Sequence, residues 1–170
     1  MLKKAVFPGS FNPFHLGHLD ILRRAARVFE QVIVAVYENP SKPLLFTVEE
    51  RIELVRETVK DAQISNVQVA SFRGLTVDYL KSVEAYVMIR GLRVFSDFEF
   101  EFRMALANQR LAPEIEIVNF MTGEQYIHIS STTVREIASL GGDVSSMVPP
   151  NVEAALRRRF ADKTSLSTDM

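Results

Sequence analysis

The sequence predicts a single-domain α/β protein: a doubly wound, Rossmann-like, five-stranded parallel sheet with helices on both faces. Two observations support this fold. Short apolar segments alternate along the chain with amphipathic helical segments, which is the pattern of successive βαβ units. One expected strand, residues 31–37 (QVIVAVY), is almost wholly apolar, as a strand covered on both faces should be. A chain of 170 residues is long enough to bury a sizeable core.

The first half of the chain contains three expected strands and three expected helices. Thr47 and Glu50 have the spacing of a capping box and start the clearest of these helices. Two prolines between residues 39 and 43 indicate a loop. In chain order we expect a strand at 5–7, a helix from Leu16, strands at 31–37 and 66–70 on either side of the capped helix, and a short helix at 75–81.

The second half continues the alternation. We expect strands at 85–90 and 114–120, separated by a helix over 96–111 that Pro113 ends. A capping box at residues 133–136 should open a short helix, and Asn151 should cap a last helix that runs through Arg159. Residues 1–160 then form the domain, and residues 161–170 are expected to form a disordered C-terminal tail.

The helix expected over 96–111 has an unusual distribution of apolar residues. Phe98, Phe102 and Ala105 share one helical face, and Phe100 and Met104 lie on a second. The alternation FEFEF also fits a strand, but the length of the segment favours a helix. Two apolar faces suggest contact with another subunit; the alternative is that a second core layer covers them.

Composition excludes several classes of function. Lys plus Arg total 20 and Asp plus Glu 21, so no basic excess points to a nucleic acid partner. The chain has no cysteine, which excludes disulfides, zinc–thiolate sites and thiol chemistry. The apolar run near the N-terminus is too short for a signal peptide, and none approaches the ~20 residues of a membrane span. We therefore expect a cytoplasmic protein without a membrane partner.

Phosphate-binding residue types follow every expected strand, at the edge where parallel sheets bind ligands. The stretch GSFNPFHLGH, residues 9–18, places a strand, a tight loop and a helix N-terminus in succession, which favours an anion. His15 and His18 can each donate a hydrogen bond there. The other loops supply Lys42, residues 74–76, Arg90 to Arg93, and the hydroxyl run from Ser130 to Thr132, which is expected to open a helix. Together these groups fit a polyphosphate.

Each of these residues also has an ordinary structural explanation. His15 and His18 as a metal-binding pair lack an evident third ligand, and Arg90 at a strand end can simply pair with Asp97 or Glu101. The serine and threonine run can be only a helix cap. Their placement on one edge of the sheet favours the functional interpretation.

Three segments resemble a known family. FPGSFNPFHLGH and HISSTTVRE resemble the two motifs of the HxGH-type nucleotidyltransferases. Together with NPSKPLLFTVEER and IRGLRVFSDFEFE they are similar to bacterial phosphopantetheine adenylyltransferases, in order and over residues 3–159. The resemblance implies transfer of the adenylyl group of ATP to 4′-phosphopantetheine, giving dephospho-coenzyme A and pyrophosphate by direct in-line displacement. It also implies Mg²⁺ as cofactor, held mainly by the ATP phosphates, a homohexamer, and coenzyme A as a candidate inhibitor.

The resemblance also implies roles for individual residues. His18, Lys42, Arg93 and Ser10 would be catalytic, with Ser10 standing where the family usually has threonine. Ser10, Lys42, Thr76 and Arg90 would bind the acceptor. ATP would contact Gly9, Ser10, Phe11, His15, Gly17, His18, Gly91, Leu92, Arg93, Glu101, Tyr126, Ile127, His128, Ile129, Ser130, Ser131 and Thr132. Two alternatives stay open: a sister nucleotidyltransferase with another phosphorylated acceptor such as nicotinamide mononucleotide, and a non-catalytic nucleotide-binding sensor.

Overall fold

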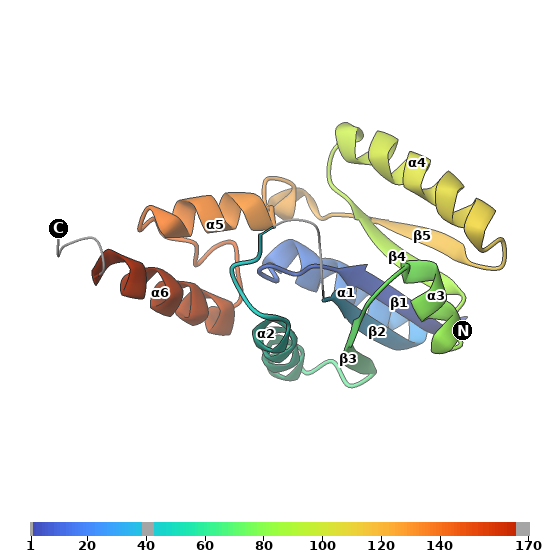
Figure 1. Ribbon diagram of the computed structural model, residues 1–170, viewed down its shortest axis with the longest axis horizontal. Helices are drawn as coiled ribbons and strands as arrows, with labels where there is room; N and C mark the ends of the chain where they lie inside the picture. The colour runs from blue at the N-terminus through green and yellow to red at the C-terminus, as the bar shows by residue number, and fades with distance from the viewer. Residues whose placement is uncertain (1, 39–42, 166–170) are drawn as a thin grey trace.

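The structure is a computed structural model that describes residues 2–38 and 43–165. It contains a five-stranded sheet in the order β3-β2-β1-β4-β5, and every neighbouring pair of strands is parallel. The strands are β1 (Leu2–Gly9), β2 (Phe29–Tyr37), β3 (Val67–Phe72), β4 (Val87–Leu92) and β5 (Glu116–Met121). The helices are α1 (Leu16–Val28), α2 (Val48–Asp61), α3 (Thr76–Ser82), α4 (Phe95–Leu111), α5 (Ser131–Ser139) and α6 (Pro150–Ser165), with a 3₁₀ turn η1 (Glu124–Tyr126). The predicted fold class is confirmed (Figure 1).

Both faces of the sheet are covered, because alternate residues of the central strands enter different cores. Val32 and Val34 of β2 pack with apolar residues of α1 and α2. Ile33 and Ala35, the alternate residues, belong to the cluster that includes α3. The β-branched run in β2 therefore has the two-sided burial that its composition predicts.

Helices α5 and α6 pack beside the sheet on a third cluster, which also includes Phe46 and Leu54 of the α2 region (Figure 1). Ile129, the residue before the Ser130 cap, is fully buried in this cluster. The third cluster thus fixes the N-terminus of α5 relative to the carboxyl edge of the sheet.

The expected helix starts at Thr133 and Asn151 are wrong, whereas the expected opening of a helix by the run Ser130–Thr132 is confirmed. Helix α5 begins at Ser131, and Ser130 is its N-cap, because the Ser130 hydroxyl accepts a hydrogen bond from the Thr133 N–H; the capping box at 133–136 is not formed. Helix α6 begins at Pro150, which suits a first helical position, and continues to Ser165 instead of ending at Arg159. Residues 161–165, assigned from sequence to a tail, are therefore helical, and 166–170 lie outside the described residues.

Asn151 does not cap α6 but joins it to α2. Its amide donates to the Leu54 carbonyl (2.9 Å) and to the Glu57 carboxylate (3.2 Å), and its side-chain oxygen accepts from the Thr58 hydroxyl (3.1 Å). A polar residue at a helix start can cap its own helix or bridge to a neighbour, and residue spacing alone does not separate the two.

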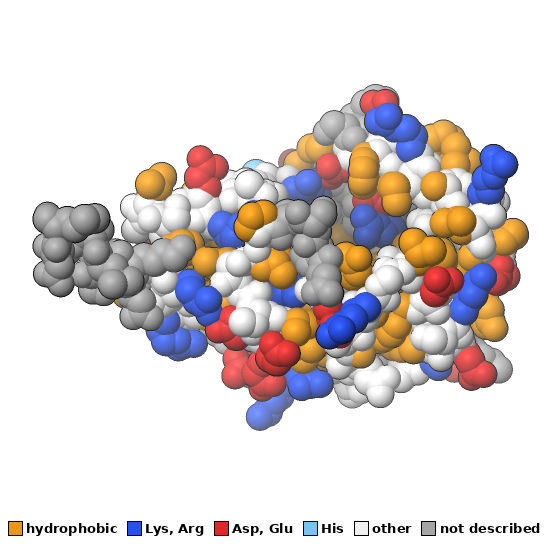
Figure 2. All heavy atoms as spheres, in the orientation of Figure 1, with side chains coloured by type: hydrophobic (Ala, Val, Ile, Leu, Met, Phe, Trp, Pro, Cys, Tyr) orange, Lys and Arg blue, Asp and Glu red, His pale blue; other side chains and the backbone are white. Residues whose placement is uncertain are grey.

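Helix α4 leaves its apolar side chains uncovered. Phe98 is 49% exposed, Phe100 55% and Phe102 53%, and hydrophobic side chains gather on the surface over this helix (Figure 2). The alternative of a second core layer within the chain is wrong for these residues. None of the described helices has the length and hydropathy needed to cross a membrane.

We predict that Asn151→Ala lowers the free energy of unfolding by about 1–2 kcal/mol, because buried carbonyl and hydroxyl groups of α2 lose their partner. Urea denaturation measures the loss, and Arg158→Ala, at an exposed position on the same helix, should stay within about 0.5 kcal/mol of the wild type. A double-mutant cycle with Thr58→Val should show coupling; purely additive losses would mean that the bridge between α6 and α2 contributes nothing.

Candidate active site

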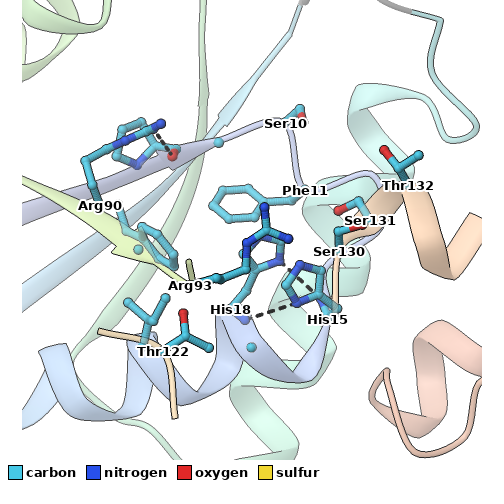
Figure 3. Close-up of a pocket in the computed structure, with 16 residues that line it drawn as sticks. Ser10, Phe11, His15, His18, Arg90, Arg93, Thr122, Ser130, Ser131 and Thr132 are labelled. Atoms are coloured by element: carbon cyan, nitrogen blue, oxygen red, sulfur yellow. Dashed lines mark hydrogen bonds between the residues drawn. The ribbon is translucent and has the colours of Figure 1, made fainter. Parts of the chain in front are cut away.

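A cavity of about 410 Å³ lies where β1 and β4 meet, the point at which the order of the strands reverses. These strands are in register at Val6 and Met88, and residues beyond that pair line the cavity. The lining consists of Phe7, Pro8, Gly9, Ser10, Phe11, His15, Gly17, His18, Ile21, Arg90, Gly91, Arg93, Thr122, Ser130, Ser131 and Thr132. Figure 3 shows His15 and His18 between the loop after β1, the end of β4 and the start of α5.

His15 and His18 cap α1 reciprocally. The Nδ1 atom of His15 accepts a hydrogen bond from the backbone N–H of His18 (3.3 Å), and Nδ1 of His18 accepts from the N–H of His15 (3.2 Å) (Figure 3). Histidine thus fills both positions of a capping box. Because Nδ1 is the acceptor in each ring, each neutral imidazole carries its proton on Nε2. The cap therefore leaves an Nε2–H donor on each histidine.

The two imidazole rings lie in a tightly packed aromatic environment. They stack on each other with centroids 3.5 Å apart, and His18 also contacts Phe11 (5.1 Å) and Phe14 (5.3 Å). Gly17 permits this stack, since a Cβ there would lie 3.2 Å from the His15 ring. Cavity-facing histidines in such packing are held in one orientation.

Both histidines are kept neutral by their surroundings. Burial, reinforced by the charge of Arg93, lowers the pKa of His15 from 6.5 to about 3. Burial is also the main cause that holds the pKa of His18 well below 6.5, followed by the charges of His15, Arg93 and Arg90. A neutral imidazole is a hydrogen-bond donor that needs no proton from solvent.

Two backbone N–H groups at the start of α1 do not serve an anion as the sequence suggests. The Leu16 N–H donates to the Met147 carbonyl (2.9 Å), and the His18 N–H is used by the cap. Leu16 and Met147 both pack on the third cluster, which brings the Leu16 N–H to the Met147 carbonyl. The anion-binding capacity at this point therefore rests more on side chains than the strand–loop–helix pattern implies.

The two arginines of the site are held by carboxylates. Arg90 makes a two-pronged contact with Glu101 (2.8 and 2.6 Å), and Arg93 pairs with Asp97 (3.0 Å) and also donates to the Ile129 carbonyl (3.1 Å). Pairing of Arg90 with an acid was one of the two interpretations open from sequence. Both guanidinium groups still line the cavity, so an incoming phosphate would compete with or share these partners.

The hydroxyl run is brought to the cavity by the start of α5. The Ser131 hydroxyl donates to the Pro13 carbonyl (2.9 Å), which ties α5 to the loop after β1, while the Ser130 hydroxyl caps α5. Thr132 lies beside them and is exposed. This end of the cavity is thus built from two parts of the chain that are far apart in sequence (Figure 3).

The structure brings most of the predicted site residues together. Those that line the cavity are Gly9, Ser10, Phe11, His15, Gly17, His18, Arg90, Gly91, Arg93, Ser130, Ser131 and Thr132. Predicted residues outside the lining are Thr76 at the start of α3, Leu92 in β4, Glu101 on Arg90, and Tyr126, Ile127, His128 and Ile129 before α5. Lys42 lies outside the described residues.

Sequence reasoning missed four lining residues and one pairing. Phe7 and Pro8 are the end of β1, Ile21 comes from α1, and Thr122 follows β5. Two of these residues could have been predicted from the sequence: Ile21 is an apolar residue of α1, and Thr122 directly follows a strand. The pairing of Asp97 with Arg93 follows from their i, i+4 spacing at the start of α4.

The donor set of the cavity suits an anion better than a bare cation. Its hydroxyl, imidazole and guanidinium groups are mostly donors, and the two nearby carboxylates are engaged by arginines. Among residues 2–38 and 43–165, no cluster of three or more histidine, aspartate or glutamate side chains could hold a metal ion.

We predict that acidification destabilises the protein as the pH falls from about 6.5 toward 3. As the pH falls, both histidines are protonated in the unfolded chain before they are protonated in the folded protein, since their pKa values are lower in the folded state. Their contribution is complete above the unfolded pKa of about 6.5 and is lost as the pH falls toward the folded value, at up to about 1.4 kcal/mol per pH unit for each histidine. Protonation of Nδ1 also removes the cap. Urea denaturation at several pH values measures the slope.

His15→Asn should reduce this slope by about half, since asparagine caps helices without titrating. His128→Asn, at an exposed position, should keep the slope of the wild type. The same slope in the wild type and His15→Asn would contradict the burial argument.

Comparison with known proteins points to one family. The profile of the cytidylyltransferase-like family matches residues 6–137. The chain is 53% identical over 156 residues to a protein of Roseiflexus sp. (strain RS-1) named phosphopantetheine adenylyltransferase, covering 92% of this chain and 96% of the relative. A protein of the same name from Carboxydothermus hydrogenoformans is 50% identical over 159 residues, covering 94% and 97% of the two chains.

Solved structures confirm the fold at low sequence identity. Plasmodium falciparum nicotinic acid mononucleotide adenylyltransferase, complexed with NaAD, superposes with a TM-score of 0.72 at 14% identity, covering 95% of this chain and 98% of that one. A bifunctional NMN adenylyltransferase/ADP ribose pyrophosphatase from Francisella tularensis gives a TM-score of 0.73 at 18% identity, over 93% of this chain and 49% of that one. The profile match and the identities near 50% show that the chain belongs to the phosphopantetheine adenylyltransferase family, within the cytidylyltransferase-like nucleotidyltransferases.

Proposed function

We propose that this protein transfers the adenylyl group of ATP to 4′-phosphopantetheine, giving dephospho-coenzyme A and pyrophosphate. The observation that carries the proposal is the convergence of two neutral histidines, two arginines and a run of hydroxyls on one cavity at the carboxyl edge of the sheet. Its volume, about 410 Å³, is in the range of cofactor-sized sites. The relatives near 50% identity support the choice of acceptor.

The reaction needs positioning and charge stabilisation more than acid–base chemistry. An oxygen of the acceptor phosphate forms a bond to the α-phosphorus of ATP, while the bond from that phosphorus to the bridging oxygen breaks and pyrophosphate leaves. The attacking phosphate is already an anion, so no general base and no covalent enzyme intermediate are needed. His18, through Nε2–H, donates to an α-phosphate oxygen as charge develops there.

Other residues of the cavity hold the two substrates in line. Ser10 contacts the phosphates of both, and Arg93 and the Ser130–Thr132 turn hold ATP. Arg90 binds the acceptor phosphate together with Lys42, and Thr76 contacts the pantetheine arm. Because Glu101 occupies the Arg90 fork, acceptor binding requires this carboxylate to share the guanidinium or turn toward ATP.

Mg²⁺ enters this proposal as part of the nucleotide. It would neutralise charge on the ATP phosphates, and no side chain of the chain is assigned to it. We place the reaction in the cytoplasm, where ATP is made, and assign coenzyme A, which resembles the product, as a candidate inhibitor.

We also propose that the chain assembles as a homohexamer through the apolar face of α4. The exposure of Phe98, Phe100 and Phe102 supports this, since apolar patches of this kind usually contact another protein surface. Sedimentation velocity distinguishes a hexamer from a monomer, and Phe100→Glu should shift the distribution to smaller species.

The experiment that tests the reaction is pyrophosphate release from ATP and Mg²⁺ with three acceptors side by side: 4′-phosphopantetheine, nicotinamide mononucleotide and glycerol 3-phosphate. We expect turnover with 4′-phosphopantetheine alone. Turnover with another acceptor would favour a sister enzyme, which the relatives do not support, and ATP binding without turnover would favour a sensor.

His18→Ala should lower kcat about 10²–10³-fold, because it removes a donor to the transition state. The KM for ATP should change less than about tenfold, since ATP keeps its other contacts. Steady-state kinetics at saturating acceptor measures both constants.

His18→Gln is the matched variant, because glutamine at the third helical position accepts the His15 N–H in a capping box. His18→Gln should retain the stability of the wild type, whereas His18→Ala should lose about 1 kcal/mol of unfolding free energy. Both variants should lose most of kcat. Equal losses in kcat and in ATP affinity would argue against a transition-state role for His18.

A further inference from the structure

Arg51 is a fully buried cation that the proposed reaction does not use directly. It lies near the start of α2 and is 0% exposed. Its Nη1 donates to the carbonyls of Ser10 and Tyr37, both at 2.7 Å, and its Nη2 donates to the Glu38 carbonyl (3.3 Å). Nε adds a bond to the Thr47 carbonyl (3.3 Å). One guanidinium therefore joins the loop after β1, the end of β2 and the N-cap of α2.

No carboxylate within residues 2–38 and 43–165 forms an ion pair with Arg51. Glu38, whose backbone carbonyl accepts from Arg51, directs its carboxylate to Ser71 and Arg73 instead. A buried charge is costly unless its hydrogen-bonding capacity is filled. Here four hydrogen bonds to backbone carbonyls occupy most of it, and lysine could not reach the same set because only the planar guanidinium offers several donors in a fixed fork.

The Ser10 carbonyl is the contact that links Arg51 to the cavity. Fixing this oxygen fixes the plane of the peptide between Ser10 and Phe11, and so restrains the backbone from which the Ser10 side chain extends. Phe11 has φ of 45°, in the left-handed region that non-glycine residues rarely adopt, so the surroundings must hold it. Its ring is held by Phe7 and Phe14, with centroids 5.4 and 5.5 Å away. Arg51 holds the other side of the same turn.

We infer that Arg51 is a positioning residue for adenylyl transfer and that it acts through Ser10. It lies outside the cavity lining, so it does not contact the substrates. By holding the Ser10 carbonyl it directs the Ser10 hydroxyl toward the phosphates, and a small misplacement of such a group is enough to lower the rate. The inference rests on the proposed function, since Ser10 is assigned there to the phosphates of both substrates.

A double-mutant cycle on activity tests the inference. Arg51→Lys and Ser10→Ala, singly and combined, are assayed for kcat/KM with 4′-phosphopantetheine. Each single change should lower kcat/KM ~10- to 100-fold. In the double variant, the loss in kcat/KM should be at least about fivefold smaller than the product of the two single losses. The reason is that Arg51→Lys can no longer misplace a hydroxyl that Ser10→Ala has already removed.

Stability provides the readout that separates positioning from a structural role. The losses in unfolding free energy should add, because the Ser10 hydroxyl takes no part in the bonds of Arg51 to backbone carbonyls. Arg56→Lys, on the exposed side of the same helix, should leave both activity and stability unchanged. If Arg51→Lys does not fold, the cycle is run with Arg51→Gln, whose amide can still serve the Ser10 carbonyl.

The outcomes are distinguishable. An active wild type with multiplicative losses in the double variant would overturn the inference and leave the proposed function standing. A wild type inactive with every acceptor would overturn the proposed function and the inference together.

Discussion

The reciprocal cap between His15 and His18 is the interaction on which the site depends. It sets the start of α1, turns both rings into one stack, and selects the tautomer that presents Nε2–H. All three effects require neutral imidazoles, since a proton on Nδ1 removes the acceptor. Burial by the aromatic cluster of the loop after β1 supplies that condition by lowering both pKa values. The start of α1 and the hydrogen-bond donors of the cavity therefore both depend on neutral imidazoles at His15 and His18.

The charged groups described at the site are compensated, just as the histidines are kept neutral. Arg90 and Arg93 are each paired with a carboxylate, so without substrates the described part of the site carries no unpaired arginine at its surface. A third cation, Arg51, lies beneath the turn after β1, and its hydrogen bonds go to backbone carbonyls. Such a site can be assembled and packed before an anion arrives, and its paired arginines can exchange carboxylates for phosphates when one does.

The sheet and most of the cavity were predictable because they follow from local patterns. The two-sided burial of β2 is visible in its composition, and parallel strands necessarily bring their following loops to one edge. Predictions failed where several local patterns compete. Ser130 and Thr133 both fit an N-cap, and burial of Ile129 in the third cluster selects Ser130.

Some features have no local sequence signal. Asn151 bridges to α2 because α6 packs there, a contact of residues far apart in the chain. Histidine is also an uncommon capping residue, so the pair His15 and His18 indicates a ligand or a metal more readily than a helix start. Arg51 was assigned no role because a basic residue on an amphipathic helix is ordinarily exposed.

The order of the strands separates the residues assigned to ATP from two of those assigned to the acceptor. The residues assigned to ATP follow β1 and β4 or open α5, while two of those assigned to the acceptor, Lys42 and Thr76, follow β2 and β3. In the order β3-β2-β1-β4-β5, Thr76 follows the edge strand β3, whereas Ser10 and His18 line the cavity between β1 and β4. The cavity is built from β1, β4, α1 and the start of α5, because the loops on either side of the point where the strand order reverses leave a space between them.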